Sequence, residues 1–266
     1  SGFELQLDGR IIDRAVKWDL GVNFSLNRSK VLVLSEDKDI FGGELDNTIL
    51  KDQLNLMRVG EPMYVFYGYV EDGYDENGHI VYKNMDDDPA ITAADKTIIG
   101  DPNPDFLVNL TTAVSYKGFT LSAFFQSSIG NDIYSLSMAA QAYDYGYNGN
   151  TLREVYYNHW TPENPTAKYP NLDQTSYKMS DRFVYDGSFV RLKNLELAYD
   201  VPCARSKFIK RARVYVSAQN LFTITSYPFW DPDINANGGG SSMIQGVDSY
   251  CYPSARTYTI GCRLTF

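Results

Sequence analysis

Residues Val16 to Asn27 read VKWDLGVNFSLN, and this stretch decides the fold. Every second residue in it is apolar, from Val16 and Trp18 through to Leu26, and the residues between them are polar or small. An alternation with a period of two, sustained over about a dozen residues, is typical of a β-strand with one apolar and one polar face. The stretch therefore predicts a long strand that separates two different environments.

The same alternation recurs in six further runs. In the last of them, every second residue from Tyr258 and Ile260 to Phe266 belongs to the apolar row. Near Asn194 the apolar row changes parity, which predicts a β-bulge. The expected strands cover residues 2–9, 15–27, 106–116, 119–129, 189–200, 211–223 and 255–266.

The connections between these strands alternate between short and long. Short turns are expected near residues 9–14, 117–118 and 201–210, and long polar loops over 28–105, 130–187 and 224–254. Loops of this length are unusual inside a compact soluble domain. Short turns on one side and long loops on the other are typical of an outer-membrane β-barrel. A soluble β-sandwich also alternates, but its strands are usually shorter. The pattern favours an all-β antiparallel transmembrane barrel segment.

The composition excludes several other classes. With 24 basic and 33 acidic residues, the net charge of -9 offers no basic surface for nucleic acid. The chain has no apolar run of about 18 residues, so no transmembrane helix is expected. Cys203, Cys251 and Cys262 lack metal-ligand spacing and are expected to be free thiols, while two histidines in polar loops give little basis for an enzyme.

Seven short motifs, in order, resemble the C-terminal part of the SusC/RagA family of TonB-dependent transporters. They are Gly100–Phe106 (GDPNPDF), Tyr116–Phe119 (YKGF), Phe125–Tyr134 (FQSSIGNDIY), His159–Pro165 (HWTPENP), Phe189–Asn194 (FVRLKN), Tyr215–Thr223 (YVSAQNLFT) and Tyr252–Tyr258 (YPSARTY), before a terminal Phe266. Each string alone is weakly specific, but their order and spacing together are specific. The resemblance covers nearly the whole chain.

The resemblance implies a barrel of about 22 strands around an N-terminal plug. A second polypeptide, the rest of the same protein, would then contain about fifteen strands, the plug and the TonB-contacting segment. It is required because a sheet with unpaired edge strands is not stable in a lipid bilayer. The family works with a SusD-type surface lipoprotein, sometimes as a dimer of SusC–SusD pairs. It imports glycans or oligopeptides across the outer membrane of Gram-negative, Bacteroidetes-like bacteria and needs no cofactor.

Two other functions remain open at this stage. A siderophore, haem or cobalamin receptor would have a similar barrel, and a non-transporting adhesin or scaffold would lack a TonB-binding segment. An enzyme would need a catalytic constellation facing the interior, for which the sequence offers no candidate. Co-purification of a SusD-type lipoprotein would separate the first alternative from the nutrient importer.

One acidic loop is a candidate for Ca²⁺ or Mg²⁺ binding. Asn84, Asp86, Asp88, Ile91 and Asp95 lie near positions 1, 3, 5, 8 and 12 of an EF-hand-like loop. Pro89 stands where that loop usually has its glycine, and Asp95 where it usually has a glutamate. The alternative interpretation is a solvated acidic loop tip.

The long loops also contain candidate substrate-binding residues. Aromatic side chains there can stack on sugar rings or pack around peptide side chains, and carboxylates can bind polar groups. The alternatives are a loop core and a partner contact. The candidates are Tyr143, Tyr145, Tyr147, Tyr227, Trp230, Asp231 and Tyr250. The inward-facing charges of the strands, among them Arg191, Arg213 and Arg263, are expected to form salt bridges and plug contacts.

Overall fold

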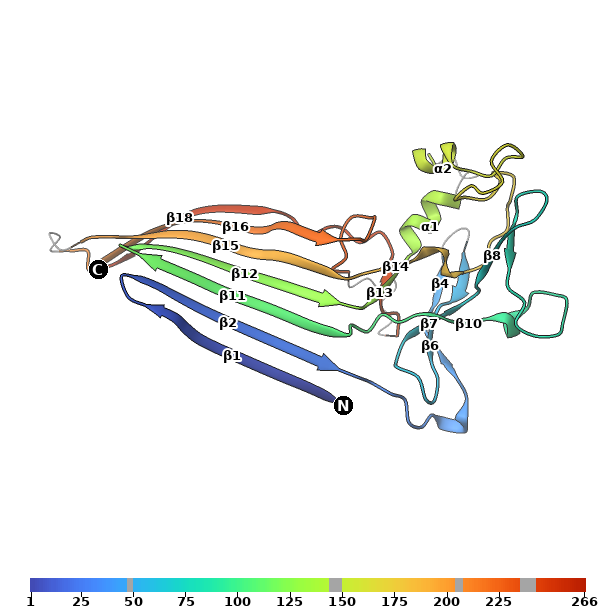
Figure 1. The fold of residues 1–266 in the computed structure, drawn as a ribbon, viewed down its shortest axis with the longest axis horizontal. Coiled ribbons are helices and arrows are strands. Elements are labelled where there is room, and N and C mark those ends of the chain that lie inside the picture. The colour runs from blue at the N-terminus through green and yellow to red at the C-terminus, as the bar shows by residue number, and fades with distance from the viewer. Residues whose placement is uncertain (47–49, 144–149, 204–207, 235–242) are drawn as a thin grey trace.

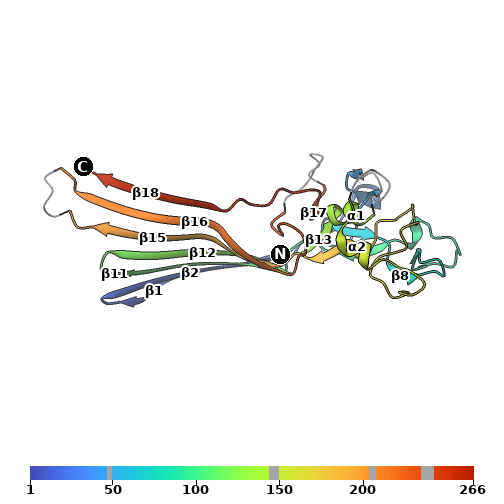
Figure 2. The ribbon, with the colours of Figure 1, turned by 90° about the horizontal axis from the view of Figure 1, so that it is seen from above.

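The computed structural model describes residues 1–46, 50–143, 150–203, 208–234 and 243–266. Its main feature is a sheet of seven antiparallel strands in the order β1-β2-β11-β12-β15-β16-β18. Figures 1 and 2 show a long sheet with a separate folded region at one of its ends. This region is formed by the long connections between the strands, and we call it the loop region. Strands β1 and β18 form the two edges, so the sheet is open within this chain. The expected antiparallel β architecture is confirmed.

The seven strands lie close to the ranges expected from the alternation. They are β1 (Gly2–Asp13), β2 (Val16–Asn27), β11 (Phe106–Tyr116), β12 (Phe119–Ile129), β15 (Phe189–Val201), β16 (Arg211–Thr225) and β18 (Thr257–Thr265). The largest difference is in β1, which was expected to end at residue 9 and continues to Asp13. The pairing with β2 shifts between Arg10 and Ile12, so a bulge at Ile11 absorbs the irregular sequence that suggested a turn.

A second bulge lies where the apolar row changes parity. Leu192 and Asn194 pair with adjacent residues of β12, and Lys193 is the extra residue between them. Against β16, Leu192 pairs with Phe222 and Asn194 with Gln219, and Asn220 in that gap has a φ of 51°. Asparagine tolerates this left-handed conformation better than most residues. The predicted bulge near Asn194 is therefore present.

The strand register places the polar rows of neighbouring strands on one face of the sheet. Asn109 pairs with Asn23 on one side and Gln126 on the other, and Gln126 pairs with Arg191. The apolar rows share the opposite face, which we call the outer face. Much of that face is exposed in the chain; its large exposed residues include Phe3, Leu5, Leu7, Val16, Val114, Tyr116, Phe119, Leu121, Leu197, Val214, Val216, Tyr258, Ile260 and Leu264.

The loop region consists of short elements rather than irregular chain. Its strands are β3 (Ile40–Phe41), β4 (Glu44–Asp46), β5 (Lys51–Gln53), β6 (Asn55–Met57), β7 (Val65–Gly68), β8 (Glu71–Tyr74), β9 (Ile80–Tyr82), β10 (Thr97–Gly100), β13 (Asp132–Ser135), β14 (Val184–Asp186) and β17 (Val247–Asp248). Its helices are η1 (Ser35–Asp37), α1 (Leu136–Tyr143), η2 (Ala93–Asp95), α2 (Arg153–Tyr157) and η3 (Asp181–Phe183). The sequence predicted these stretches only as polar loops.

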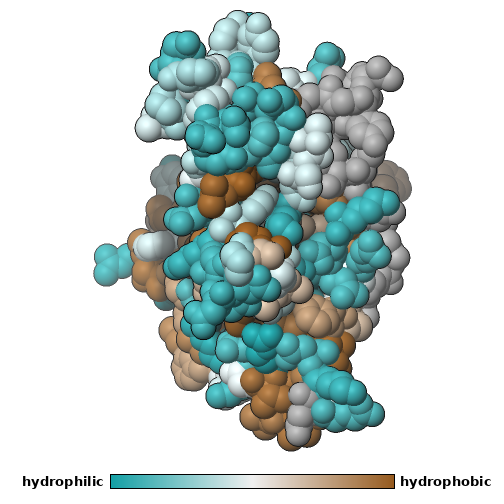
Figure 3. Space-filling model, turned by 90° about the vertical axis from the view of Figure 1, so that its right-hand side faces the viewer, coloured by the Kyte–Doolittle hydropathy of each residue, from teal (hydrophilic) through white to brown (hydrophobic). Residues whose placement is uncertain are grey.

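The loop region has its own apolar core. The core takes residues from all three long connections, for example Leu54 and Phe66 from the first, Tyr134 and Val155 from the second and Val247 from the third. Parallel pairing of β13 with β17 also joins the second and third connections. Figure 3 looks at the outer end of this region, whose surface is largely hydrophilic with separate hydrophobic areas. Burial of this core fixes the three connections to one another at the end of the sheet.

Candidate functional site

A cavity of about 450 Å³ lies where the inner face of the sheet meets the loop region. Its walls combine strand residues such as Asn109 of β11 and Gln126 of β12 with residues from each long connection. The lining residues are Met63, Tyr64, Pro102, Asn103, Pro104, Leu107, Asn109, Gln126, Ser127, Ser128, Asn131, Ile133, Phe189, Pro232, Asp233, Ile234, Gln245 and Gly246. We call this hollow the junction cavity.

The junction cavity is lined by uncharged polar groups beside apolar ones. Five of its residues carry amides, and the Oδ1 of Asn109 is buried without a hydrogen-bond partner among the described residues. An amide both donates and accepts hydrogen bonds, so this lining suits peptide groups or sugar hydroxyls more than ions. Asp233 is the carboxylate of the wall. The amide groups beside apolar side chains therefore suit a polar, uncharged ligand.

A second cavity of about 350 Å³ adjoins the first, since Pro232 lines both. We call it the Arg191 cavity. Arg191 and Arg256 line it together with Trp230 and Asp231, two of the predicted binding residues. The side chain of Trp230 is 57% exposed and stacks on Phe229 with ring centroids 4.7 Å apart. It is thus available to a planar or sugar ligand.

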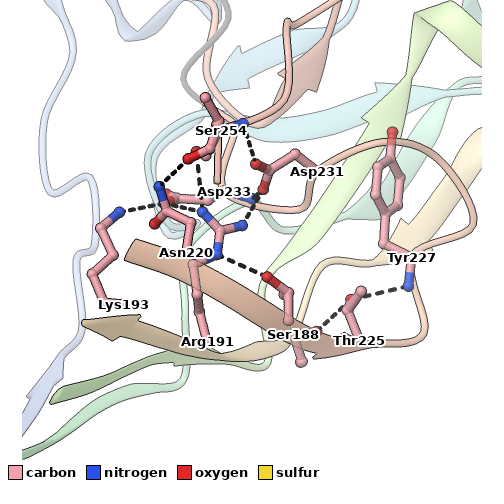
Figure 4. Close-up of polar contacts among 11 residues, drawn as sticks. Ser188, Arg191, Lys193, Asn220, Thr225, Tyr227, Asp231, Asp233 and Ser254 are labelled. Carbon is pink, nitrogen blue, oxygen red and sulfur yellow. Dashed lines mark hydrogen bonds and ion pairs between the residues drawn. The ribbon is translucent and has the colours of Figure 1, made fainter. Parts of the chain in front are cut away.

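Arg191 joins the sheet to the loop region. It projects from the inner face of β15 and is 1% exposed (Figure 4). Its guanidinium donates to Asp231, to Asp233 Oδ2 at 3.3 Å and to Ser254 Oγ at 3.2 Å, while its Nε donates to Thr223 Oγ1 at 2.9 Å. Lys193 Nζ lies 3.6 Å from the same Asp233 oxygen. These contacts hold the 226–256 connection against the strand.

Both carboxylate oxygens of Asp231 are used in this network. Oδ1 accepts from Arg191 and from the backbone N–H of Asp233, and Oδ2 accepts from the backbone N–H of Ser254. Burial opposes ionisation, but the hydrogen bonds from Ser254 and Asp233 and the Arg191 charge outweigh it, so the pKa of Asp231 lies below its usual range. The structure thus gives Asp231 a positioning role. Direct contact with substrate stays a prediction.

Tyr227 forms a second buried network beside the first. Its hydroxyl contacts Asp248 Oδ2 at 2.5 Å and Ser135 Oγ at 2.8 Å, and joins β13 to β17 and to the end of β16. Burial and the neighbouring Asp248 carboxylate raise the pKa of Tyr227, so the hydroxyl stays protonated and donates. Tyr227 therefore joins elements of the loop region through its hydroxyl, and it lines neither of the two cavities described above.

The other predicted aromatic residues are spread over the region. Tyr143 is buried at the end of α1 and stacks on Tyr177 with ring centroids 3.8 Å apart, so it belongs to the loop core. Tyr250 is 54% exposed. Tyr145 and Tyr147 lie outside the described residues. The described candidates thus lie in different surroundings, and substrate contact stays a prediction for all seven. Trp230 and Asp231 line a common cavity, whereas Tyr143 and Tyr227 are packing residues.

The predicted metal loop is closed by hydrogen bonds to its own backbone. Asn84, Asp86 and Asp88 each accept from the N–H two residues further on. Asp95 is fully buried and accepts from the N–H groups of Met85 and Thr92, which lowers its pKa. Within the described residues, three or more Asp, Glu, His or Cys side chains nowhere converge as a metal site. Binding of Ca²⁺ or Mg²⁺ at residues 84–95 stays a prediction.

Sequence reasoning missed the amide residues of the junction cavity as site candidates. The alternation had already placed Asn109 and Gln126 on the polar face, but nothing local distinguishes them from other inward-facing polar residues. Asn103 and Gln245 reach the cavity only through the folding of the long connections. The three cysteines have no disulfide partner, as expected. In the described part of the chain, no helix is long and apolar enough to span a bilayer.

The relatives of the chain are TonB-dependent receptors. It is 31% identical over 287 residues to TonB-dependent receptor P3 of Formosa agariphila and 27% identical over 276 residues to TonB-dependent receptor SusC of Bacteroides thetaiotaomicron. All of the chain is matched in both cases, but only 28% and 26% of these relatives. A search against family models found no match.

Solved structures that resemble the chain belong to the same class. The structure of the RagAB peptide transporter superposes with a TM-score of 0.79 at 26% identity, and the closed-closed state of the RagAB peptide importer with 0.81 at 25%. Each match covers the whole chain and 29% of the other chain. The fold is therefore that of a segment of the wall of a TonB-dependent receptor barrel. The chain is a segment of a TonB-dependent receptor of the SusC/RagA type, and it spans between a quarter and a third of the length of such relatives.

Proposed function

We propose that the chain forms part of the wall and three extracellular connections of a nutrient importer in the outer membrane of a Bacteroidetes-like bacterium. The two-faced sheet carries this proposal. Its outer row is apolar and exposed, its inner row is polar, and the folded loop region covers one end. An apolar outer band with a polar interior is the arrangement of an outer-membrane barrel. The named relatives are receptors and a transporter, which agrees with a non-enzymatic role.

The substrate is a glycan or an oligopeptide that binds first at the junction cavity. The amide lining supports this choice, because hydrogen bonds from amides suit the peptide bonds or hydroxyls of an uncharged polymer. The similar RagAB structures are those of a peptide transporter and a peptide importer, which supports a peptide.

Three partners follow from this function. The rest of the same receptor closes the barrel around a plug, because the open edges of β1 and β18 need partners in lipid. A SusD-type surface lipoprotein covers the loop region, in a complex that forms a dimer of pairs. TonB acts through the remaining part of the receptor, since energy for import comes from the inner membrane.

The experiment is an uptake assay with the full-length receptor in its host. Asn109→Ala combined with Gln126→Ala removes two amides from the junction cavity. The matched control is Thr111→Ala with Ser122→Ala, which changes inner-face residues of the same two strands outside that cavity. Energised cells are given labelled oligopeptides and oligosaccharides. We expect about tenfold lower uptake of one class, equal to a loss of about 1.4 kcal/mol, for the cavity variant alone.

Two results would contradict the proposal. Unchanged uptake by the cavity variant, at equal surface abundance, would remove the junction cavity from the substrate path. Absence of energy-dependent uptake of either class by cells with the unmodified receptor would favour an adhesin or scaffold. Mass spectrometry of the purified complex would identify a co-purified lipoprotein or retained ligand.

A further inference from the structure

The Arg191 cavity lies where the pairing between β16 and β18 ends. The last pair joins Gln219 to Thr257, whereas β16 continues to Thr225. Residues 222–225 of β16 therefore pair with β15 on one side and, among the described residues, with no strand on the other. Asn220 and Thr225 from this end of β16 line the cavity. An unpaired strand edge thus borders the cavity, and its backbone N–H and C=O groups can pair with an added strand.

Specific hydrogen bonds keep the segment before β18 away from this edge. The N–H of Ser254 donates to Asp231 Oδ2 at 2.9 Å (Figure 4). Asn220 Nδ2 donates to the carbonyl oxygen of Ala255 at 3.0 Å. Residues of the segment 253–256 therefore line the cavity together with those of β16 instead of extending the strand pairing. The opening between the two is a built feature of the fold.

Two polar groups of the cavity wall have no partner among the described residues. The Oδ1 of Asn220 is buried and accepts no hydrogen bond, and the guanidinium of Arg256 forms no ion pair. Arg191 and Asp231 balance each other in a direct ion pair, so Arg256 gives the wall an excess positive charge. The stretch 235–242 of the same connection reads NANGGGSS and contains no carboxylate. The wall therefore lacks a donor for Asn220 and an anion for Arg256.

The C-terminal end of a peptide has the groups that this wall lacks. Its carboxylate can bind the Arg256 guanidinium bidentately, and an N–H of its last residues can donate to Asn220 Oδ1. An extended peptide can also add its backbone to the free edge of β16, which is a common mode of peptide recognition. A uronic acid of a glycan offers a carboxylate, but it has no backbone N–H groups at the spacing of a strand. The chemistry of the wall therefore favours a peptide.

We propose that the Arg191 cavity binds the free C-terminus of an oligopeptide, with its carboxylate on Arg256 and its last amide N–H on Asn220 Oδ1. The proposal rests on the importer function above and narrows its substrate class to peptides with an unmodified C-terminus. The cavity volume of about 350 Å³ is near the lower limit of ordinary ligand pockets, so it holds the end of a peptide and not a whole one. The junction cavity adjoins it at Pro232 and takes the preceding residues.

A competition between two peptide libraries tests the proposal on the purified full-length receptor, together with any lipoprotein that co-purifies. One library contains pentapeptides with a free C-terminal carboxylate, and the other contains the same sequences with a C-terminal amide. Mass spectrometry counts the retained peptides. We expect about a fivefold or larger excess of the acids on the unmodified receptor and equal retention of acids and amides on Arg256→Gln. Arg256→Lys keeps the charge and should keep part of the preference.

The matched control is Arg153→Gln. Arg153 is an exposed arginine at the start of α2 in the loop region, and it lines neither the junction cavity nor the Arg191 cavity. Its substitution should leave the preference for acids unchanged. The ratio of acids to amides is measured within each sample, so a general loss of binding through misfolding does not imitate a loss of preference. Heat-modifiable mobility reports folding of each variant.

The contrary results are equally specific. Equal retention of acids and amides by the unmodified receptor, or retention of neither, would overturn the proposal. A preference that survives in Arg256→Gln would overturn it as well, and so would a uronic-acid oligosaccharide retained through Arg256 in place of peptides. Energy-dependent uptake is not part of this test. A receptor that prefers the acids but imports nothing would keep the site and lose the importer function, whereas import without the preference would refute the site alone.

Discussion

The sheet and the loop region differ in the exposure of their apolar side chains. In the loop region, residues such as Leu54, Phe66 and Val155 are completely buried among one another. In the sheet, the outer row stays exposed, and Ile260 reaches 86%. The loop region therefore buries its apolar residues in a core, whereas the sheet exposes those of its outer face. This difference indicates that the two parts have different surroundings, water for the loop region and hydrocarbon for the outer face.

The Arg191 network connects the two regions, and its loss should have the largest effect. Arg191→Ala removes the charge that compensates the buried Asp231 and should reduce the free energy of unfolding by about 3–5 kcal/mol. The measurement is urea-dependent folding of the full receptor into lipid vesicles. Arg10→Ala is the matched control, because its ion pair with Asp19 is half exposed to water and should contribute little to stability. Equal losses for the two variants would show that Arg191 does not anchor the connection.

A pair of leucine truncations compares the regions directly. Leu54→Ala leaves a cavity in the loop core and should cost about 2–5 kcal/mol. Leu121→Ala on the outer row should cost only about 1–2 kcal/mol, because lipid fills the space and the transfer free energy alone is lost. Both are measured by the same unfolding titration. A larger cost at Leu121 would mean that protein, and not lipid, packs against the outer face.

Arginine substitutions should distinguish the two faces of the sheet. Val22→Arg or Leu110→Arg places a charge in the apolar row and should impair assembly by about 2–4 kcal/mol near the bilayer midplane. Asn23→Arg, one residue from Val22, faces the polar interior and should be tolerated better. Folding yields in lipid vesicles provide the comparison. Similar losses on both parities would remove the distinction between the faces.

The prediction with the smallest consequence for the fold is chemical and lies in the 226–256 connection. Burial, together with the neighbouring Asp248 carboxylate, raises the pKa of Cys251 to about 11. Because the thiolate is the reactive form, Cys251 should alkylate about 100-fold more slowly at pH 8 than an ordinary thiol. Its rate should rise about tenfold per pH unit up to pH 10. Peptide mass spectrometry of iodoacetamide-treated receptor measures this. A rate equal to that of glutathione would refute the burial of the thiol.

The sheet was predictable because its signal is local. Apolar and polar residues alternate with a period of two within each strand. The bulge at Lys193 is visible in the sequence as a change in the parity of the apolar row near Asn194. The extension of β1 to Asp13 was missed because Gly9 and the repeated apolar pair Ile11–Ile12 interrupt the alternation. A bulge at Ile11 restores the register after this interruption.

The site was far less predictable because it depends on contacts between distant segments. The bond from Arg191 to Asp231 spans 40 residues, and the one from Tyr227 to Ser135 spans 92. Aromatic content in a long loop suggested ligand contact, but Tyr143 is buried against Tyr177. No local pattern distinguishes a tyrosine that packs in a loop core from one that faces a ligand. Charge was more informative, because Arg191 was expected to form a salt bridge and it pairs with Asp231.

The facing of β12 in a membrane is the most direct test of the two-faced sheet. Spin labels attached to single cysteines along residues 119–126 of the full receptor in liposomes report collisions with oxygen, which enriches in lipid, and with a polar nickel chelate. Labels at Leu121, Ala123 and Phe125 should collide mainly with oxygen, and those at Thr120, Ser122 and Gln126 mainly with the chelate. If the labels at Leu121, Ala123 and Phe125 were shielded from both reagents, or if accessibility had no period of two, the outer row would not face lipid.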